Sequence, residues 1–548
     1  MRRSVVSRDF AILWAVLVFT GLWCRPLTPV DETRAASVAW EMWQRGDFLV
    51  PHLNGEAYSH KPLLLQWSMH LAWLLGGVHD WTTRLVAPLF GLANLFLIAS
   101  LARRLWPERH DTHILAPLVL LSFPVWALWT TLTLYDMLVA CFTLLGLLGI
   151  WRSAQGETWP GRLLTGFAIG GGVLSKGPVI LLLILPTALL APWWIAKRPA
   201  RGWVSWYLGL LGSVLLGAAL ALAWAIPAGI AGGEGYRHAI FWGQSAGRIA
   251  HSFAHGRPFW WYGAILPMLL FPWVFRVSLW RSRPVAKFKA DHGLRFYLAH
   301  LGGVTLLLSL VSGKQVHYLL PVLPTAALIL ARLLPESDRS RFRLDQAWLG
   351  GLLALLAAGL LALPHLPGDW GEAGKIVTAA PLAPELALLA IGAALIFWHP
   401  ATALSALKVS AYALIGFVVL AHPIYWESSR PRYDMAALGA RLHVLQSQGK
   451  PVAYWGKYSG DFQFAGRLAG PLAVLLTERE LDGWLAANPA GYVVIVSSAE
   501  GTGRIPEMIE RYRGTRRRIG LWRASELTID AALRGELLGK ASGGSDSP

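Results

Sequence analysis

Long runs of apolar residues, separated by short polar segments, dominate the chain as far as residue 421. A helix that spans the hydrocarbon core of a bilayer needs about 20 mostly apolar residues, so the pattern predicts about thirteen transmembrane helices. The runs occupy residues 10–23, 85–105, 113–131, 134–151, 162–175, 178–196, 204–228, 259–280, 295–312, 318–334, 347–364, 382–398 and 402–421.

The composition agrees with this pattern. Of the 548 residues, 55% are hydrophobic and 15% are charged, whereas an ordinary soluble domain carries about 25% charged residues. The net charge of +17 comes mostly from Lys and Arg in short loops between the apolar runs. Such loops mark membrane topology and contact anionic lipids, so we expect membrane lipids and no nucleic acid as partners. The fold class predicted is a polytopic α-helical membrane protein.

The first apolar run follows three arginines, as the core of a signal peptide would. No small-residue cleavage site comes after it, so we expect a retained anchor. Cys24 and Cys141 lie in or beside apolar runs. They fit packing as small hydrophobic residues better than a disulfide or a metal site.

The stretch 63–79 could either span the membrane or lie at its surface. Cytoplasmic loops carry an excess of Lys and Arg. If 63–79 lies flat, the basic N-terminus and all the basic loops share one side; if it spans, the first helix conflicts with every later loop. We therefore expect a juxtamembrane helix within a non-cytoplasmic first loop over 25–84. The basic loops are 103–109, 152–162, 197–201, 276–289 and 339–343.

Near residue 422 charged residues return and the apolar runs shorten. The pattern predicts strands at 452–455, 491–496 and 518–522 and helices at 434–446 and 478–487. We expect a transmembrane domain over 1–421, then a small α/β domain over 422–548 outside the cytoplasm. Its last residues, Gly543–Pro548, are expected to be disordered.

The first loop carries charged residues that a plain linker would not need. Asp31, Glu32 and Arg34 follow the first span, and His60 and Lys61 follow an amphipathic run over 36–48. Ionisable groups near hydrocarbon are functional candidates by default. Asp31 and Glu32 could be general bases or metal ligands, or could merely end the first helix. Lys61 could hold a phosphate, or could snorkel to the interface.

The same face collects further ionisable groups at helix ends. Asp136 starts the run 134–151, and Lys176 lies between 162–175 and 178–196. These two could serve the chemistry, or could pair with each other structurally. Substrate contacts are also expected from residues that precede another helix on this face, which are Lys314, Gln315, His317 and Tyr318.

The loop 229–258, on the same face, offers both histidines and arginines. Imidazole and carboxylate ligands from separate loops suit a divalent metal, but the spacing is no signature. Arginine binds phosphate through paired hydrogen bonds, and it could equally contact lipid headgroups. The residues concerned are Glu234, His238, His251, His255, Arg237, Arg248 and Arg257.

Familiar nucleotide and hydrolase motifs are absent from the sequence. It contains no Walker A motif, no dinucleotide-binding glycine fingerprint, no HExxH and no GxSxG. We therefore expect no nucleotide cofactor, and an activated substrate that arrives through the lipid phase.

With these residues, the chain resembles the membrane glycosyltransferases of the GT-C type. It is most similar to the bacterial branch of the protein-O-mannosyltransferase superfamily that includes the aminoarabinose transferase of lipid A. The resemblance covers residues 10–335, and the first loop is its specific part. The segments that carry it are 31–34, 41–42, 46–55, 58–62, 135–136, 175–178, 244–248 and 313–321.

The resemblance implies sugar transfer from a polyprenyl (undecaprenyl) phosphate donor to lipid A or another envelope acceptor, at the periplasmic face of the bacterial inner membrane. Asp31 would be the catalytic carboxylate, with Glu32 beside it. The family usually has Glu where this chain has His60, so a metal site would have to use His60 with His251 or His255. The other expected roles are carrier-phosphate or substrate binding by Arg34, Tyr58, Lys61, Arg248, Lys314, His317 and Tyr318, and contact with the sugar by Asp136 and Lys176.

Direct displacement, with Asp31 as the base and Lys61 and Arg248 as a cationic clamp, predicts inversion at the anomeric carbon. We expect the chain to act as a monomer. One alternative is a flippase for lipid-linked sugars, although transporters usually show internal repeats and broken helices at the membrane midplane. Another is a non-catalytic subunit of an envelope assembly.

Overall fold

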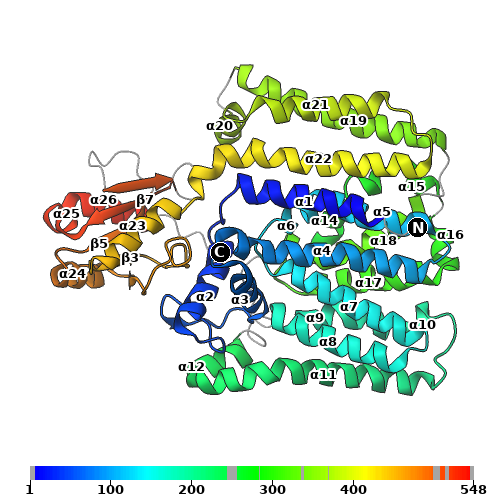
Figure 1. The fold of residues 1–548 in the computed structure, drawn as a ribbon, viewed down its shortest axis with the longest axis horizontal. Helices are drawn as coiled ribbons and strands as arrows, with labels where there is room; N and C mark the ends of the chain where they lie inside the picture. The colour runs from blue at the N-terminus through cyan, green and yellow to red at the C-terminus, as the bar shows by residue number, and fades with distance from the viewer. Residues whose placement is uncertain are drawn as a thin grey trace.

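The computed structural model describes residues 6–243, 256–282, 284–334, 339–367, 370–497, 507–511 and 517–542. A bundle of long helices makes up most of the molecule, and a small mixed sheet with its own helices lies at one end of the bundle (Figure 1). The bundle helices are α1 Val6–Cys24, α2 Asp31–Arg45, α3 Leu64–Gly76, α4 Asp80–Leu105, α5 His110–Ser122, α6 Pro124–Thr130, α7 Asp136–Ala154, α8 Thr158–Lys176, α9 Val179–Leu189, α10 Ala191–Trp194, α11 Gly202–Ala231, α12 Gly233–His238, α14 Trp261–Leu269, α15 Val277–Arg281, α16 Pro284–Ala290, α17 His292–Leu310, α18 Leu323–Leu333, α19 Arg339–Ala362, α20 Gly371–Thr378, α21 Leu382–Phe397 and α22 Ala403–Ser429.

Within the described ranges, seven helices are long and apolar enough to cross a membrane. They lie at Asp80–Leu105, Asp136–Ala154, Gly202–Ala231, His292–Leu310, Val316–Leu333, Phe342–His365 and Ala403–Trp426. The pair α5 and α6 would make an eighth, and Asp9–Cys24, Val179–Leu189 and Leu382–Phe397 are shorter apolar helices. The chain is therefore a multi-pass α-helical membrane protein, as predicted, but helix length does not establish the count of about thirteen spans.

Several of the predicted spans are not single straight helices, and two of them have a visible cause. In 113–131 the chain bends by 77° between α5 and α6, where Pro124 keeps the residue before it out of the helical conformation. The run 259–280 is divided into α14, the 3-10 turn Trp273–Phe275 and α15. Pro272 interrupts this run because it has no backbone N–H to donate.

The two ends of the bundle differ. The sheet, α2, α3 and α12 lie at one end, whereas the start of α1, α10, α15 and α16 lie at the other (Figure 1). The basic segments beside α10 and α16 are thus on the end opposite the first loop. Helix α3, which covers most of the ambiguous stretch 63–79, has 13 residues, fewer than the about 20 that a spanning helix needs.

Five strands form the sheet in the order β4-β3-β5-β7-β6. The three central strands match the predicted ones, while the two edge strands were not predicted. Strand β3 runs parallel to β4 and β5, and β7 is antiparallel to β5 and β6. The strands are β3 Val452–Trp455, β4 Ala473–Leu475, β5 Tyr492–Ser497, β6 Met508–Arg511 and β7 Arg518–Arg523, with helices α23 Ala436–Ser447, α24 Glu478–Ala487, α25 Ala524–Ile529 and α26 Ala531–Ser542.

Both faces of this sheet are covered. Along β5, Val494 packs with Leu442 of α23 on one face, whereas Val493 and Ile495 pack with Leu481 of α24 on the other. Successive side chains of a strand point to opposite faces, so this short apolar run supplies both cores. The result is the small α/β unit that the sequence predicted.

Candidate functional site

Helices α7 and α8 form an antiparallel pair that brings two buried charges together. Asp136 begins α7 and Lys176 ends α8, and the Lys176 Nζ lies 2.7 Å from Asp136 Oδ1. The helices pack closely because a Cβ at Gly149 would lie 2.7 Å from the carbonyl oxygen of Gly161. The helix dipole stabilises a negative charge near a helix N-terminus and a positive charge near a helix C-terminus, so both charges are at favourable positions. The pairing considered in the sequence analysis therefore exists.

A row of aromatic rings extends from this ion pair. Lys176 Nζ lies 5.2 Å from the centre of the Tyr318 ring, close enough for a cation–π contact. Tyr318 meets the ring of His317 edge-on at 4.7 Å, and His317 stacks against Trp129 at 6.2 Å. The segment Val316–Val322 thus presents two of the predicted substrate-binding residues beside the ion pair.

Lys61 approaches the same place from the first loop. Its Nζ lies 6.0 Å from the centre of the Tyr135 ring, and Tyr135 directly precedes Asp136. Burial raises the pKa of the Tyr135 phenol further above its usual value, and its oxygen accepts a hydrogen bond of 2.7 Å from Gln66 Nε2. Lys61 also lies within electrostatic range of Asp136 and of His317.

Asp31 and Arg34 occupy the first turn of α2 at the edge of this group. The Asp31 side chain is 79% exposed, and its Oδ1 lies 3.8 Å from Arg34 Nη1. Both residues interact electrostatically with Tyr135, and Asp31 also with His317. An exposed carboxylate thus borders a set of cationic and aromatic side chains.

Tyr58 lies nearby and is buried with Val38 and Met42 of α2. Its ring is 5.0 Å from that of His60, and it interacts electrostatically with Tyr135. The structure therefore brings together eight of the residues expected from the sequence, referred to below as the polar cluster. These are Asp31, Arg34, Tyr58, Lys61, Asp136, Lys176, His317 and Tyr318.

Glu32 does not fit the catalytic role expected for it. Its carboxylate accepts hydrogen bonds from Arg25 at 2.5 and 3.0 Å and from the backbone N–H groups of Thr28 and Thr133 at 3.0 and 2.6 Å. Only 3% of its side chain is exposed. Burial alone would raise the pKa of Glu32, but Arg25 and its hydrogen bonds lower it below the usual value. This position fits a structural role, because both carboxylate oxygens are buried and hydrogen-bonded within the protein.

Lys314 also differs from its expected role. It is buried, and its Nζ donates to the backbone oxygens of Arg257 at 3.0 Å and Val311 at 2.5 Å. Around it, Gly256 and Gly313 form an isolated antiparallel β-bridge, and the Arg257 N–H donates to Ser312 O. Lys314 therefore fixes the segment around residue 257 to the one before Val316, rather than extending toward a substrate.

The expected metal site is not assembled within the described ranges. No three His, Cys, Asp or Glu side chains gather there in a way that could hold a metal ion. His60 is exposed beside Tyr58. Arg248, His251 and His255 lie outside the described residues. No chemical step below depends on a metal.

Three residues of the site escaped the sequence analysis. Tyr135 was noticed only as the neighbour of Asp136, although its ring lies 6.0 Å from the Lys61 Nζ. Gln66 had a usable signal, because it is a polar residue in the apolar stretch 63–79. Trp129 had none, since tryptophan is common throughout this chain.

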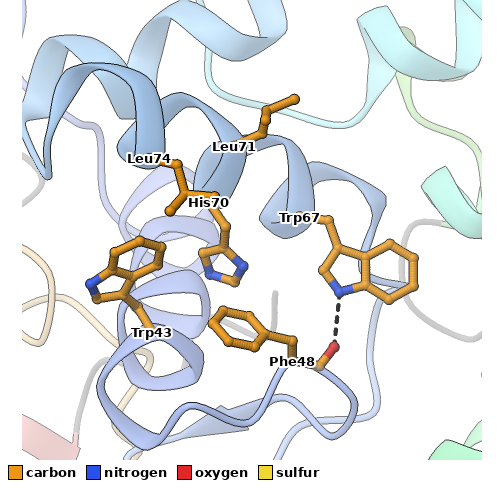
Figure 2. Close-up of a pocket in the computed structure, with 6 residues that line it drawn as sticks. All are labelled: Trp43, Phe48, Trp67, His70, Leu71 and Leu74. Atoms are coloured by element: carbon orange, nitrogen blue, oxygen red, sulfur yellow. Dashed lines mark hydrogen bonds between the residues drawn. The ribbon is translucent and has the colours of Figure 1, made fainter.

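A separate apolar pocket of 520 Å³ opens between α2 and α3. Figure 2 shows its lining side chains, with His70 at the centre and the Trp67 Nε1 donating to the Phe48 carbonyl at 2.9 Å. The lining residues are Trp43, Phe48, Trp67, His70, Leu71 and Leu74, and none of them belongs to the polar cluster. The pocket is therefore distinct from the candidate site.

Known proteins resemble this chain over most of its length. Residues 60–227 match the family described as dolichyl-phosphate-mannose-protein mannosyltransferase. A protein of Pectobacterium carotovorum, named undecaprenyl phosphate-alpha-4-amino-4-deoxy-L-arabinose arabinosyl transferase, is 30% identical over 389 residues, which cover 67% of each chain. The chain belongs to the same family of glycosyltransferases as this protein, which is called ArnT-like below.

Other ArnT-like relatives agree. An Edwardsiella ictaluri protein of the same name is 30% identical over 390 residues, which cover 66% of each chain. The ArnT of Cupriavidus metallidurans shares the fold, with a TM-score of 0.74 at 19% identity over 94% of this chain and 97% of that one. Its structure bound to undecaprenyl phosphate gives 0.71 at 19% identity, over 96% and 98%. The predicted family, GT-C fold and glycosyltransferase class are confirmed.

Proposed function

We propose that this glycosyltransferase moves a sugar from a polyprenyl phosphate donor to lipid A or another cell-envelope acceptor, at the periplasmic face of the bacterial inner membrane. The observation that carries the proposal is the polar cluster itself. It combines one exposed carboxylate, Asp31, with the cations Lys61 and Lys176 at the end of a membrane bundle. A base beside a cationic site suits the departure of a phosphate.

Asp31 is the proposed general base. The acceptor oxygen bonds to the anomeric carbon while the bond from that carbon to the phosphate oxygen breaks. The acceptor proton passes to the Asp31 carboxylate, and the bonding electron pair leaves on the polyprenyl phosphate. Asp31 is suited to this role because its side chain is exposed and its ion pair with Arg34, the one that the described residues provide, is long at 3.8 Å. A single displacement of this kind inverts the anomeric configuration.

Lys61 is the proposed contact for the leaving phosphate. An ammonium group stabilises the negative charge as it develops. Lys176 is held by Asp136 and by the Tyr318 ring, so we assign this pair to the sugar side of the cluster. Arg248 remains a proposed second phosphate contact, and a metal at His60 and His255 remains a proposal as well.

The relatives support the class of donor. Those at about 30% identity are named for undecaprenyl phosphate-linked aminoarabinose, and the ArnT of Cupriavidus metallidurans has been solved with undecaprenyl phosphate. We extend the donor lipid to this chain and leave the sugar open, because His60 stands where the family usually has Glu.

Transfer by the purified protein tests the proposal. The protein is supplied with synthetic undecaprenyl-phosphate sugars and a membrane lipid extract, and the product's anomeric configuration is read by NMR. We expect an inverted product from wild type and from Glu56→Gln, a matched control that removes an exposed carboxylate of the same loop. Asp31→Asn should transfer sugar about 10²–10⁴-fold more slowly. A retained configuration contradicts direct displacement, and an Asp31→Asn protein with a rate close to wild type removes Asp31 as the base. No transfer with any donor contradicts the function.

A further inference from the structure

Helix α2 carries Asp31 and Arg34, yet its N-terminal turn has no side-chain cap, because Val30 precedes it. Contacts with residues 460–468, far along the chain, hold the helix instead. Thr33 Oγ1 lies 3.2 Å from Asp461 Oδ1, Ser37 Oγ donates to Gly460 O at 2.7 Å, and Trp40 Nε1 donates to Leu468 O at 3.1 Å. The spacing of 33, 37 and 40 places these side chains on one face of the helix.

The hairpin that follows α2, made of the antiparallel strands β1 His52–Leu53 and β2 Glu56–Ala57, is held by the same segment. Asn54 and Gly55 form its turn with φ values of 55° and 86°, as an Asn-Gly hairpin turn requires. The Asn54 side chain donates to Leu472 O at 2.9 Å and accepts from Leu472 N and Gln463 Nε2, both at 2.8 Å. A single turn residue thus makes three hydrogen bonds to the C-terminal unit.

Glu41 of α2 completes the set of contacts by binding the turn of the hairpin. Its carboxylate accepts hydrogen bonds from the backbone N–H groups of Asn54 and Gly55, the latter at 3.0 Å. Helix α2, the hairpin and residues 460–472 therefore form one closed hydrogen-bonded unit. A shift of any one part must stretch bonds to the other two.

The packing leaves little room for such a shift. Gly460 has a φ of +87°, and a Cβ at this position would lie 2.7 Å from Leu53 Cδ1 and 3.5 Å from the Arg34 Cα. Phe464 stacks on Trp73 of α3 at 5.7 Å and 8°. Arg467 pairs with Asp80, at the start of α4, at 3.1 Å. Residues 460–467 thus contact α2, the first strand of the hairpin, α3 and the start of α4.

We propose that residues 460–472 are a positioning element for the glycosyl-transfer site. They hold α2 and the hairpin, and through them fix where Asp31, Arg34 and Lys61 stand relative to Asp136 and Lys176. This inference rests on the proposed function for its catalytic consequence, while the docking itself is independent of the reaction. A misplacement of about 1 Å at a reacting group can lower a rate by about a hundredfold.

Two variants loosen the contact without disturbing the elements themselves. Ser37→Ala removes the bonds to Gly460 O and Phe464 N, and alanine is a better helix former than serine. Asn54→Gly removes the three side-chain bonds, and glycine accepts the positive φ of the turn. We expect kcat to fall about tenfold in each and about a hundredfold in the double variant. The KM for undecaprenyl-phosphate sugar should change less than kcat in Ser37→Ala, because Lys61 lies beyond the hairpin.

Hydrogen exchange at the α2 amides, followed by mass spectrometry on the full-length protein, supplies the readout for docking. Exchange should be faster in both variants. Two variants are the controls. Ser68→Ala loses one hydrogen bond of 2.7 Å to Leu64 O within α3. Glu507→Gln weakens the ion pairs of the sheet unit with Arg441 and Arg523. Both should keep the wild-type kcat.

The outcomes separate cleanly. Faster α2 exchange together with a lowered kcat supports the proposal. A wild-type kcat despite faster exchange, unchanged exchange in both variants, or an equal loss of kcat in Glu507→Gln overturns it. If the unmodified protein transfers no sugar, the proposed function fails, and the exchange data alone still decide whether residues 460–472 hold α2.

Discussion

Asp31 and Glu32 are adjacent carboxylates at the start of α2, but their exposure and hydrogen bonding are opposite. Glu32 has both oxygens hydrogen-bonded and is buried against Arg25. Asp31 is 79% exposed, with one long contact to Arg34. Consecutive helical residues point about 100° apart, so neighbours can face protein and cavity respectively. A charge whose hydrogen bonds are all made supports the fold; a charge left open is available for chemistry.

Asp136 lies between these extremes. It is buried like Glu32, but its partner Lys176 keeps 14% of its side chain exposed and also faces the Tyr318 ring. An ion pair that retains access to one side can hold geometry and still contact a ligand. The contrast between Asp31 and Glu32 can therefore be tested by asking which substitutions change rate and which change stability.

Asp31→Asn should have the largest effect on rate. Loss of a general base costs about 10²–10⁴-fold, so we expect kcat to fall by that amount. The melting temperature should stay within a degree or so of wild type, because the side chain is exposed. Initial transfer rates and a thermal melt in detergent decide the matter. A large fall in melting temperature would place Asp31 with Glu32 among the structural groups.

Glu32→Gln should show the reverse. Breaking a buried ion pair from one side costs about 3–5 kcal/mol, because Arg25 is left buried with less compensation. We expect a clearly lower melting temperature and, at temperatures where the variant is folded, a kcat close to wild type. If kcat falls by the amount expected for Asp31→Asn while the melt is unchanged, Glu32 takes part in the chemistry after all.

Lys61→Met should have a smaller effect, confined to the donor. A hydrogen bond to a charged group contributes about 1.5–3 kcal/mol, or about 10- to 150-fold in affinity. We expect donor binding to weaken by that factor, measured by titration with undecaprenyl phosphate. Lys450→Met, an exposed lysine on the sheet unit, is the matched control. Equal weakening in both variants would show a non-specific effect of charge.

Acid should produce the smallest effect under ordinary conditions. The pKa of Glu32 is lowered in the folded protein, so this group contributes stability above its unfolded pKa of about 4.5, which is lost as the pH falls through the folded pKa. The difference in melting temperature between wild type and Glu32→Gln should therefore shrink below about pH 4.5. A difference that stays constant down to pH 3 would contradict the ionised pair.

The sequence was informative where a pattern is local. The short apolar run Tyr492–Ser497 identified the central strand of the sheet, and the helix ends predicted Asp136 and Lys176 at the right places. The edge strands were missed because β4 has only three residues and half of the four residues in β6 are charged, whereas β3, of the same length as β6, is apolar throughout. Asp31 and Glu32 could not be separated, because one partner of Glu32, the N–H of Thr133, lies 101 residues away. Breaks in apolar runs had a visible cause in Pro124 and Pro272.

The contact between Thr33 and Asp461 joins residues that are 428 positions apart. Ribosomes add about 5–20 residues per second, so roughly 20–85 s separate the synthesis of these two residues. Throughout that interval α2 lacks the segment that secures it. Under the proposed positioning role, efficient sugar transfer begins only once residues 460–472 have been made, so a copy that stops before them would consume little donor lipid.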